Sequence, residues 1–217
     1  MSQVLRLVCL AKSWKNQGYC IAGETDNGSW VRTVTSNTQN NAIFSQANGV
    51  QPLDVFEVDV LGHYPSGHQT ENYLINEQRM FETVSSLDID QIDALVDTPV
   101  DIWGTGFSSR YGLNDKIDTA SQGTPSNSLL LIQPDDTIFV KMQNEYDKDK
   151  LRIEFTYNGE TYCLTTTYIN VQEYFRDPEN ELNEGEEEEI EAKYLSISLA
   201  EPLNGALYKV VAGVFVD

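Results

Sequence analysis

The chain has 217 residues, 40% of them hydrophobic, and a formal net charge of −20. This composition supports an ordinary core and excludes a disordered chain. No stretch approaches the ~20 apolar residues that cross a bilayer. The N-terminus lacks a signal-peptide pattern, so we expect a cytoplasmic protein without membrane contact. Cys9, Cys20 and Cys163 are widely spaced and odd in number, which favours reduced thiols.

In the N-terminal half, short alternating segments predict strands. These segments are residues 4–11, 19–23, 30–34, 55–61 and 73–75. The pairs Gln17-Gly18 and Asn27-Gly28 lie where tight turns need residues that tolerate positive φ. The first three strands are therefore expected to form an antiparallel meander. Residues 36–49 are expected to form a loop.

The C-terminal half repeats this pattern. Strands are predicted at residues 128–132, 137–142, 151–157, 160–167, 194–200 and 207–216. Asn158-Gly159 predicts a hairpin turn. Short helices are predicted at 85–96, where Ser86 is the expected N-cap, and at 168–176.

Many short strands with two short helices predict an all-β fold, either a barrel or a sandwich. Two clusters of about five strands favour two small barrels, separated by a long loop over residues 98–127. We place the first domain at residues 1–120 and the second at residues 121–217.

The negative charge is unevenly distributed. Residues 1–53 carry a net charge of +2, residues 54–147 carry −13, and residues 148–217 carry −9. Nine of the acids lie in residues 177–191, which we interpret as a mobile, self-repelling acidic loop. Phosphate contacts supply most non-specific affinity for nucleic acid. Any polyanion site must therefore be local, and the N-terminal quarter is the expected place.

The sequence contains no Walker loop, GxSxG, HExxH or paired CxxC motif. We therefore expect no catalytic residues and no cofactor, although a carboxylate acid–base pair stays open as an alternative. His63 and His68 could ligate a metal with a cysteine. Surface histidines in a turn are the simpler interpretation, so no metal is expected.

Basic and aromatic residues alternate near the first hairpin. Lys12, Ser13, Trp14 and Lys15 lie at its predicted tip. Further along, Trp30 and Arg32 point to the same face of a strand. Cations for phosphate and an aromatic plane for a base are what single-strand or nucleotide binding requires. The alternative is that Trp30 belongs to the core and the lysines only increase solubility.

Two further groups are candidate contacts. His68, Glu71 and Asn72 belong to a polar run of five residues that could read the hydrogen-bonding edge of a ligand. They could equally tie down a loop through bonds to the backbone. Arg110, beside Tyr111, forms a second basic and aromatic group, or else pairs with an internal acid. Arg152 shares that ambiguity.

Several of these segments together resemble the dual OB-containing domain family of bacterial proteins. The matching residues up to position 132 are 9–13, 18–23, 30–32, 53–55, 68–72 and 128–132. Those in the C-terminal part are Arg152, 155–159, Tyr162, 194–202 and 208–212. Two positions depart from the family pattern. Thr165-Thr166-Thr167-Tyr168 stands where an aspartate is expected, and Val34 stands where a proline often follows Thr33.

The resemblance implies two OB-like β-barrels and recognition of nucleic acid or nucleotides within prokaryotic conflict or defence systems. OB barrels bind oligomers across strands two and three and the adjoining loops, where Trp30 and Arg32 would fall. The leading hypothesis is thus a non-catalytic nucleic-acid or nucleotide binding module. The main alternative is an acidic protein-interaction component that docks a basic partner and could act as a DNA mimic.

Overall fold

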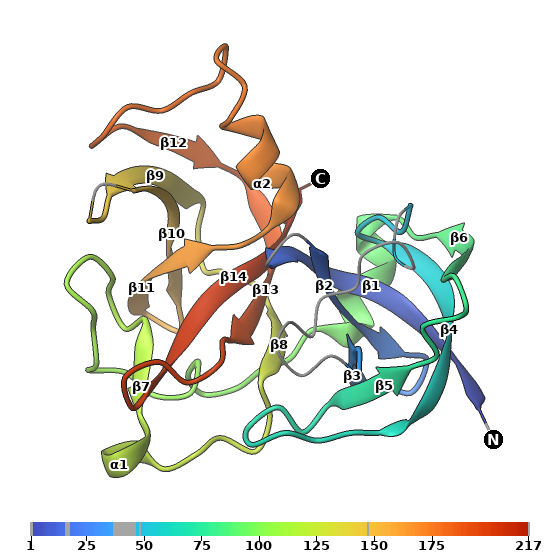
Figure 1. Cartoon of the computed structure of the whole chain (residues 1–217). Coiled ribbons are helices and arrows are strands. Elements are labelled where there is room, and N and C mark those ends of the chain that lie inside the picture. The colour runs from blue at the N-terminus through green and yellow to red at the C-terminus, as the bar shows by residue number, and fades with distance from the viewer. Residues whose placement is uncertain (1, 16–17, 37–46, 48, 147, 217) are drawn as a thin grey trace. The chain divides into compact units, whose positions relative to one another are not determined.

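The computed structural model of the chain describes residues 2–15, 18–36, 47, 49–146 and 148–216 (Figure 1). The chain divides into two compact units. Unit 1 contains Met1–Leu95 and Ser126–Leu129, and unit 2 contains Val96–Pro125 and Leu130–Asp217. Most of the predicted loop at 36–49 lies outside the described residues. The domain boundary placed after residue 120 stays a prediction.

Unit 1 contains a closed five-stranded barrel. Its strands are β1 (Gln3–Lys15), β2 (Gly18–Thr25), β3 (Trp30–Val34), β4 (Asp54–His63) and β5 (Asn72–Ile75). They pair in the order β1-β2-β3-β5-β4, and β4 closes the barrel on β1. The β3–β5 pair is parallel and the others are antiparallel. The five predicted strands are confirmed, with β1 extending further than expected.

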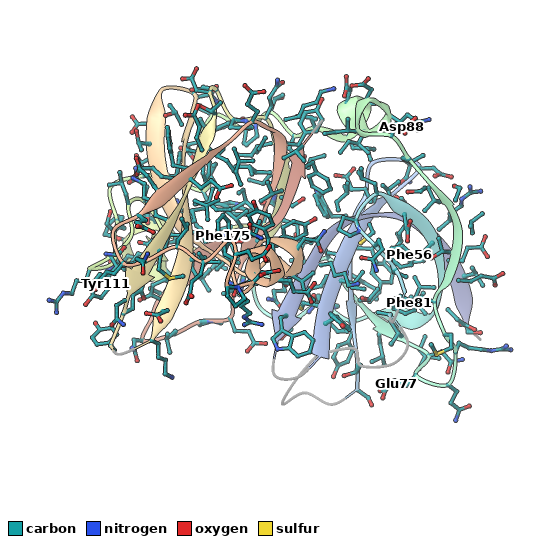
Figure 2. All side chains as sticks on the ribbon, turned by 90° about the horizontal axis from the view of Figure 1, so that it is seen from above. Phe56, Glu77, Phe81, Asp88, Tyr111 and Phe175 are labelled. Carbon is teal, nitrogen blue, oxygen red and sulfur yellow. The ribbon has the colours of Figure 1, made fainter. Side chains whose placement is uncertain are left out.

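Alternation places one side of each strand in the core of unit 1. Val31 and Val58 are buried there, and Phe56 stacks on Phe81 with ring centroids 5.4 Å apart (Figure 2). A bulge in β1 between Cys9 and Ala11 brings its backbone close to β2. There, a Cβ on Gly23 would lie 1.9 Å from the carbonyl oxygen of Val8.

We expect Gly23→Ala to lower the free energy of unfolding of unit 1 by about 1–3 kcal/mol, because the added methyl overpacks two paired strands. Urea denaturation, followed by hydrogen exchange of β1 and β2, measures the change. Gly67→Ala is an informative comparison, because open space surrounds the Cβ position and the strain comes only from its φ of +58°. A smaller loss at Gly23 than at Gly67 would contradict the overpacking argument.

Unit 2 repeats the strand order of unit 1. Its strands are β7 (Lys116–Asp118), β8 (Leu129–Ile132, whose first residue belongs to unit 1), β9 (Ile138–Asn144), β10 (Asp149–Tyr157), β11 (Glu160–Thr166), β12 (Glu187–Ile190), β13 (Ala192–Leu199) and β14 (Ala206–Val216). The sheet order is β12-β9-β10-β11-β14-β13-β8, with β7 beside β14. The run β9-β10-β11-β14-β13 matches β1-β2-β3-β5-β4, including the parallel pair β11–β14. The predicted all-β, OB-like fold is confirmed.

The core of unit 2 forms between its strands and a short helix. Phe155 and Tyr162 stack inside it with ring centroids 5.5 Å apart. Helix α2 (Ile169–Tyr174) follows β11 and buries Val171, as the predicted helix over 168–176 requires. At the β10–β11 turn, Asn158 and Gly159 have φ of 50° and 77°, which confirms the predicted hairpin. A second short helix, α1, spans Thr119–Gln122.

Two local predictions differ from the structure. The segment predicted as a helix over 85–96 holds the end of β6 (Glu82–Ser86) and a 3₁₀ helix, η1 (Ile89–Leu95). Its apolar residues recur every three positions, which fits three residues per turn better than 3.6. Part of the predicted acidic loop over 177–191 is strand β12, whose Glu187 pairs with Lys141 at 3.1 Å. Among the described residues, no helix is long and apolar enough to span a membrane.

Candidate ligand-binding groove

The residues predicted as contacts at the β1–β2 hairpin divide into buried and exposed side chains. Lys12 is buried, and its Nζ donates to a main-chain carbonyl at 2.7 Å and lies 4.8 Å from the Tyr19 ring centroid. Trp14 is 47% exposed and packs edge-on against Tyr19. Ser13 is half-buried, and the side chain of Lys15 lies outside the described part of the structure. The charge of Lys12 is thus bound inside unit 1 by a main-chain carbonyl and the Tyr19 ring.

Arg32 belongs to a buried polar network rather than to the surface. It is 4% exposed, and its Nη1 and Nη2 donate to Oγ and the carbonyl of Ser128 at 2.8 and 3.3 Å. Glu71 accepts hydrogen bonds from the main-chain N–H and the Oγ of the same serine. The structure therefore brings Arg32 and Glu71 together, and Ser128 is the residue that they share.

The other polar residues predicted in unit 1 lie near this network or in the loop beside it. Asn72 pairs directly with Arg32 across the parallel strands and is 1% exposed, and His68 is buried. Trp30 is half-buried at the start of β3. His63 Nε2 lies 2.6 Å from the carbonyl oxygen of Thr70. No group of three or more metal-ligating side chains occurs in the part of the chain that the structure describes.

These contacts place residues 126–129 on part of the face of unit 1 that OB barrels commonly use. The usual ligand face lies on strands two and three with the adjoining loops. In unit 1, residues 126–129 lie over the outward side of β3 at Arg32 and over the β4–β5 loop, where Thr70 Oγ1 donates to the carbonyl of Ser126 at 2.8 Å. The roles of Lys12 and Arg32 as phosphate contacts stay predictions, but both cations are engaged inside unit 1.

The corresponding face of unit 2 forms an open groove of about 410 Å³. Its floor comes from β10, β11 and β14, through Lys150, Arg152, Thr165, Tyr208 and Val210. Its walls come from the β9–β10 turn at 145–146, the β13–β14 loop at 200–204, and residues 109–111. In the strand order shared by the units, these are strands two, three and five, with the loops after strands one and four.

Aromatic rings and a cation line one side of the groove. Tyr146 is 74% exposed at the tip of the β9–β10 turn and meets Tyr111 edge-on, with ring centroids 5.8 Å apart. Figure 2 shows Tyr111 at the margin of unit 2. The exposed guanidinium of Arg110 lies 5.3 Å from the Tyr111 ring centroid. Tyr146 has a φ of 53°, which is uncommon for a bulky residue and frequent at binding sites.

A buried ion network forms the floor. Arg152 donates from Nε to Glu145 Oε1 at 2.7 Å and from Nη1 to Asp115 Oδ2 at 3.4 Å. Lys150 reaches the other oxygen of Glu145 at 2.9 Å. Burial alone would raise the pKa of Glu145, but hydrogen bonds from Lys150 and Arg152 outweigh it and hold the pKa below its usual value. The floor therefore carries fixed charges of both signs.

Asp115 fixes the wall formed by residues 109–111. Its Oδ1 accepts from the main-chain N–H of Ser109 at 2.7 Å, and its Oδ2 accepts from Ser109 Oγ at 2.5 Å. Gly112 leaves the space that this carboxylate fills, since a Cβ there would lie 2.0 Å from Asp115 Oδ2. Behind the wall, burial lowers the pKa of Lys209 to about 8, against the opposing effect of Asp101 and Asp115. Arg110 and Tyr111 are thus held on a braced loop.

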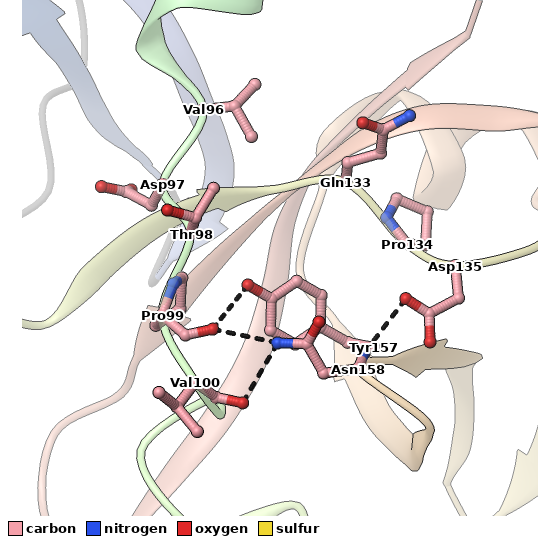
Figure 3. A pocket seen from close by; sticks show the side chains of 10 residues that line it. All are labelled: Val96, Asp97, Thr98, Pro99, Val100, Gln133, Pro134, Asp135, Tyr157 and Asn158. Carbon is pink, nitrogen blue, oxygen red and sulfur yellow. Dashed lines mark hydrogen bonds between the residues drawn. The ribbon is translucent and has the colours of Figure 1, made fainter.

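A larger cavity of about 740 Å³ lies elsewhere in unit 2, between residues 96–100, residues 133–135 and the β10–β11 turn (Figure 3). Its polar groups largely bind one another. Tyr157 Oη donates to the carbonyl of Pro99 at 2.8 Å, and Asn158 Nδ2 donates to the carbonyls of Pro99 and Val100. Asp135 accepts from the main-chain N–H of Asn158 at 3.0 Å. These bonds fasten a loop, so the groove beside Tyr146 is the stronger candidate.

Some of the groove residues were predicted from the sequence and others were not. Arg110 was predicted as a contact and lies at the groove, and Arg152 proved to be the internal ion-pair partner that one interpretation allowed. Tyr146 and Lys150 were missed. Their signal was an aromatic and a cation near the turn between two predicted strands, the same pattern that singled out Trp14 and Lys15.

The comparison with protein families agrees with this architecture. The model of a family described as Dual OB-containing domain matches residues 5–214, which spans both units. The predicted resemblance is therefore confirmed. No curated protein gave a match.

Proposed function

Because the chain belongs to the dual OB-containing domain family, we propose that it is a non-catalytic module that binds a nucleotide or single-stranded nucleic acid in the groove of unit 2. The observation that carries the proposal is the position of the groove. It lies on the strands and loops that OB folds use for ligands, whereas residues 126–129 occupy part of the matching face of unit 1, at Arg32 and Thr70.

The chemistry of the groove suits a ligand with both a ring and a phosphate. The exposed ring of Tyr146 offers a stacking surface for a base, and stacking tolerates any base identity. Arg110 and Lys150 supply cations at the rim. Since Lys150 already pairs with Glu145, few phosphates can be neutralised. We expect the logarithm of affinity to fall with the logarithm of salt at a slope of only about −1 to −2.

Fluorescence anisotropy of labelled single-stranded DNA, single-stranded RNA and a fluorescent mononucleotide tests the proposal. We expect Tyr146→Ala to weaken binding by about 5- to 150-fold, the loss of ~1–3 kcal/mol of stacking. Arg110→Glu should also weaken binding, and the loss of affinity should be larger at low salt than at physiological salt, because salt screens the charge.

Trp14→Ala is the matched control, because Trp14 is an exposed aromatic at the corresponding hairpin of unit 1. It should leave affinity unchanged. If Trp14→Ala abolishes binding while Tyr146→Ala does not, the ligand binds unit 1, as the sequence predicted. Absence of binding to all three probes at low salt would overturn the proposal.

The acidic protein-interaction function is a second candidate, favoured by exposed acids such as Glu179, Glu181 and Glu184. Deleting the whole acidic run over 177–191 would also remove β12. Replacing these three acids by glutamine is therefore the cleaner test. Weaker capture of a basic protein, with nucleotide binding intact, would support this function. The role in bacterial conflict or defence systems stays a prediction from the family.

A further inference from the structure

The structure points to a second binding site, beneath residues 126–129 of unit 1. We propose that the outward face of β3, together with the adjoining β4–β5 loop, is a site for an extended, serine-containing peptide, and that the chain's own segment 126–129, here called the strap, occupies it as an internal ligand. This proposal is independent of the groove in unit 2.

The site recognises the strap mainly through its backbone. Arg32 Nη2 donates to the carbonyl of Ser128, Glu71 accepts from the main-chain N–H of Ser128, and Thr70 Oγ1 donates to the carbonyl of Ser126. Backbone groups are the same in every peptide, so these bonds fit any extended segment. This is how sheet-edge and loop sites on other proteins hold peptides.

One side chain of the strap is read as well. The Oγ of Ser128 donates to Glu71 Oε2 at 2.9 Å and accepts from Arg32 Nη1 at 2.8 Å. A hydroxyl is both a donor and an acceptor, so it bridges a carboxylate and a guanidinium that are both at least 90% buried. Alanine at this position would leave both charged groups without these bonds. The ligand class is therefore an extended peptide with serine, or threonine, at the central position.

The strap is an imperfect occupant. Asn72, which pairs with Arg32 on the neighbouring strand, is 1% exposed, and its Oδ1 has no hydrogen-bond partner among the described residues. Burying an unsatisfied acceptor costs about 1–3 kcal/mol. A competing peptide that offers a donor to Asn72 would recover part of this cost. The strap holds its place through its covalent attachment, which gives an effective concentration of order mM.

The chain also meets the conditions for exchange. The strap is four residues long, and residues that belong to unit 2 flank it on both sides. Residues 123–128 contain no helix or strand, so Leu129, the first residue of β8, is the one strap residue that belongs to a strand. Removal of the strap would leave the closed pairing of β1 to β5 intact, because none of those five strands includes a strap residue.

The test uses the full chain and a labelled peptide with the sequence of residues 124–130, blocked at both ends, together with the same peptide carrying alanine in place of Ser128. In the chain with Ser128→Ala the resident strap is weakened by two hydrogen bonds. We expect that variant to bind the serine peptide at least 10-fold more tightly than the wild-type chain does. The alanine peptide should bind at least 10-fold more weakly than the serine peptide.

Hydrogen exchange of the wild-type chain provides a second measurement that does not depend on folding of the variant. Millimolar serine peptide should accelerate exchange of the strap amides, and the alanine peptide should not. Absence of peptide binding to the folded variant, or unchanged strap exchange in the wild type, would overturn the proposal and identify the strap as a permanent part of unit 1. Nucleotide binding in unit 2 is measured separately and decides nothing here.

Discussion

Replacing Arg152 by methionine is expected to lower the free energy of unfolding of unit 2 by about 3–5 kcal/mol, because it removes the buried cation that Asp115 and Glu145 share and leaves Glu145 paired with Lys150 alone. The side chains of Glu145 and Asp115 are 5% and 3% exposed, so water cannot replace the lost guanidinium. Hydrogen exchange of β10 and β11 in increasing urea measures the loss.

Lys150→Met is the matched control. Lys150 also pairs with Glu145, but its side chain is 43% exposed, and exposed ion pairs contribute about 0–1 kcal/mol. Equal losses for the two variants would contradict the view that burial decides the effect. Ligand affinity should fall in Arg152→Met as well, since the same ion network braces the wall that carries Arg110 and Tyr111.

The same network predicts a dependence on pH. The pKa of Glu145 is lower in the folded state than its usual value of 4.5. Its contribution to stability is therefore present above pH 4.5 and is lost as the pH falls through the folded pKa. In the Arg152→Met variant this loss on the acid side should shrink, because part of the cause of the lowered pKa is gone. If the free energy of unfolding of the variant falls with acid as steeply as that of the wild type, other carboxylates cause the acid sensitivity.

Replacing Arg32 by methionine is expected to destabilise unit 1 by about 2–4 kcal/mol. The variant loses two hydrogen bonds from a charged donor to Ser128 and leaves Glu71 buried beside an apolar side chain. Hydrogen exchange of β3, β5 and the strap measures the change. A surface arginine that only contacted phosphate would instead lose ligand affinity with no loss of stability, so this variant separates the two roles.

Arg79→Met is the comparison for this variant, because Arg79 is exposed. Surface substitutions usually change stability by less than about 0.5 kcal/mol. If Arg32→Met unfolds no more readily than Arg79→Met and fails to bind nucleic acid, the phosphate-contact hypothesis for Arg32 stands. If it is strongly destabilised, Arg32 is a structural residue.

The candidate site was only partly accessible from sequence. Arg110 was recognised because a cation beside an aromatic residue is a local pattern. Lys12 and Arg32 show the same local pattern, yet both side chains are buried, and they donate to a main-chain carbonyl and to Ser128. Ser128 lies 96 positions from Arg32 along the chain, and spacing in sequence carries no information about such a contact.

Most strand positions, by contrast, were determined by the sequence alone, because they depend on neighbouring residues. Alternation along β4 and the Asn158-Gly159 turn act within a few residues, and both are where the sequence places them. Local pattern did not predict β12, because its formation depends on a distant partner. The acidic run Glu187–Ile190 indicates mutual repulsion, but it forms a strand because it pairs with β9 and because Lys141 offsets part of its charge.

Only the tertiary structure decided which face stays open. Both units have the same strand order, and the composition of their strands does not distinguish a covered face from an exposed one. Closure of the first barrel, the position of the strap over β3, and the open groove over β10 and β11 all depend on contacts between distant segments. The free energy of such contacts comes from burial and hydrogen bonds made after the chain has folded, which local propensity does not contain.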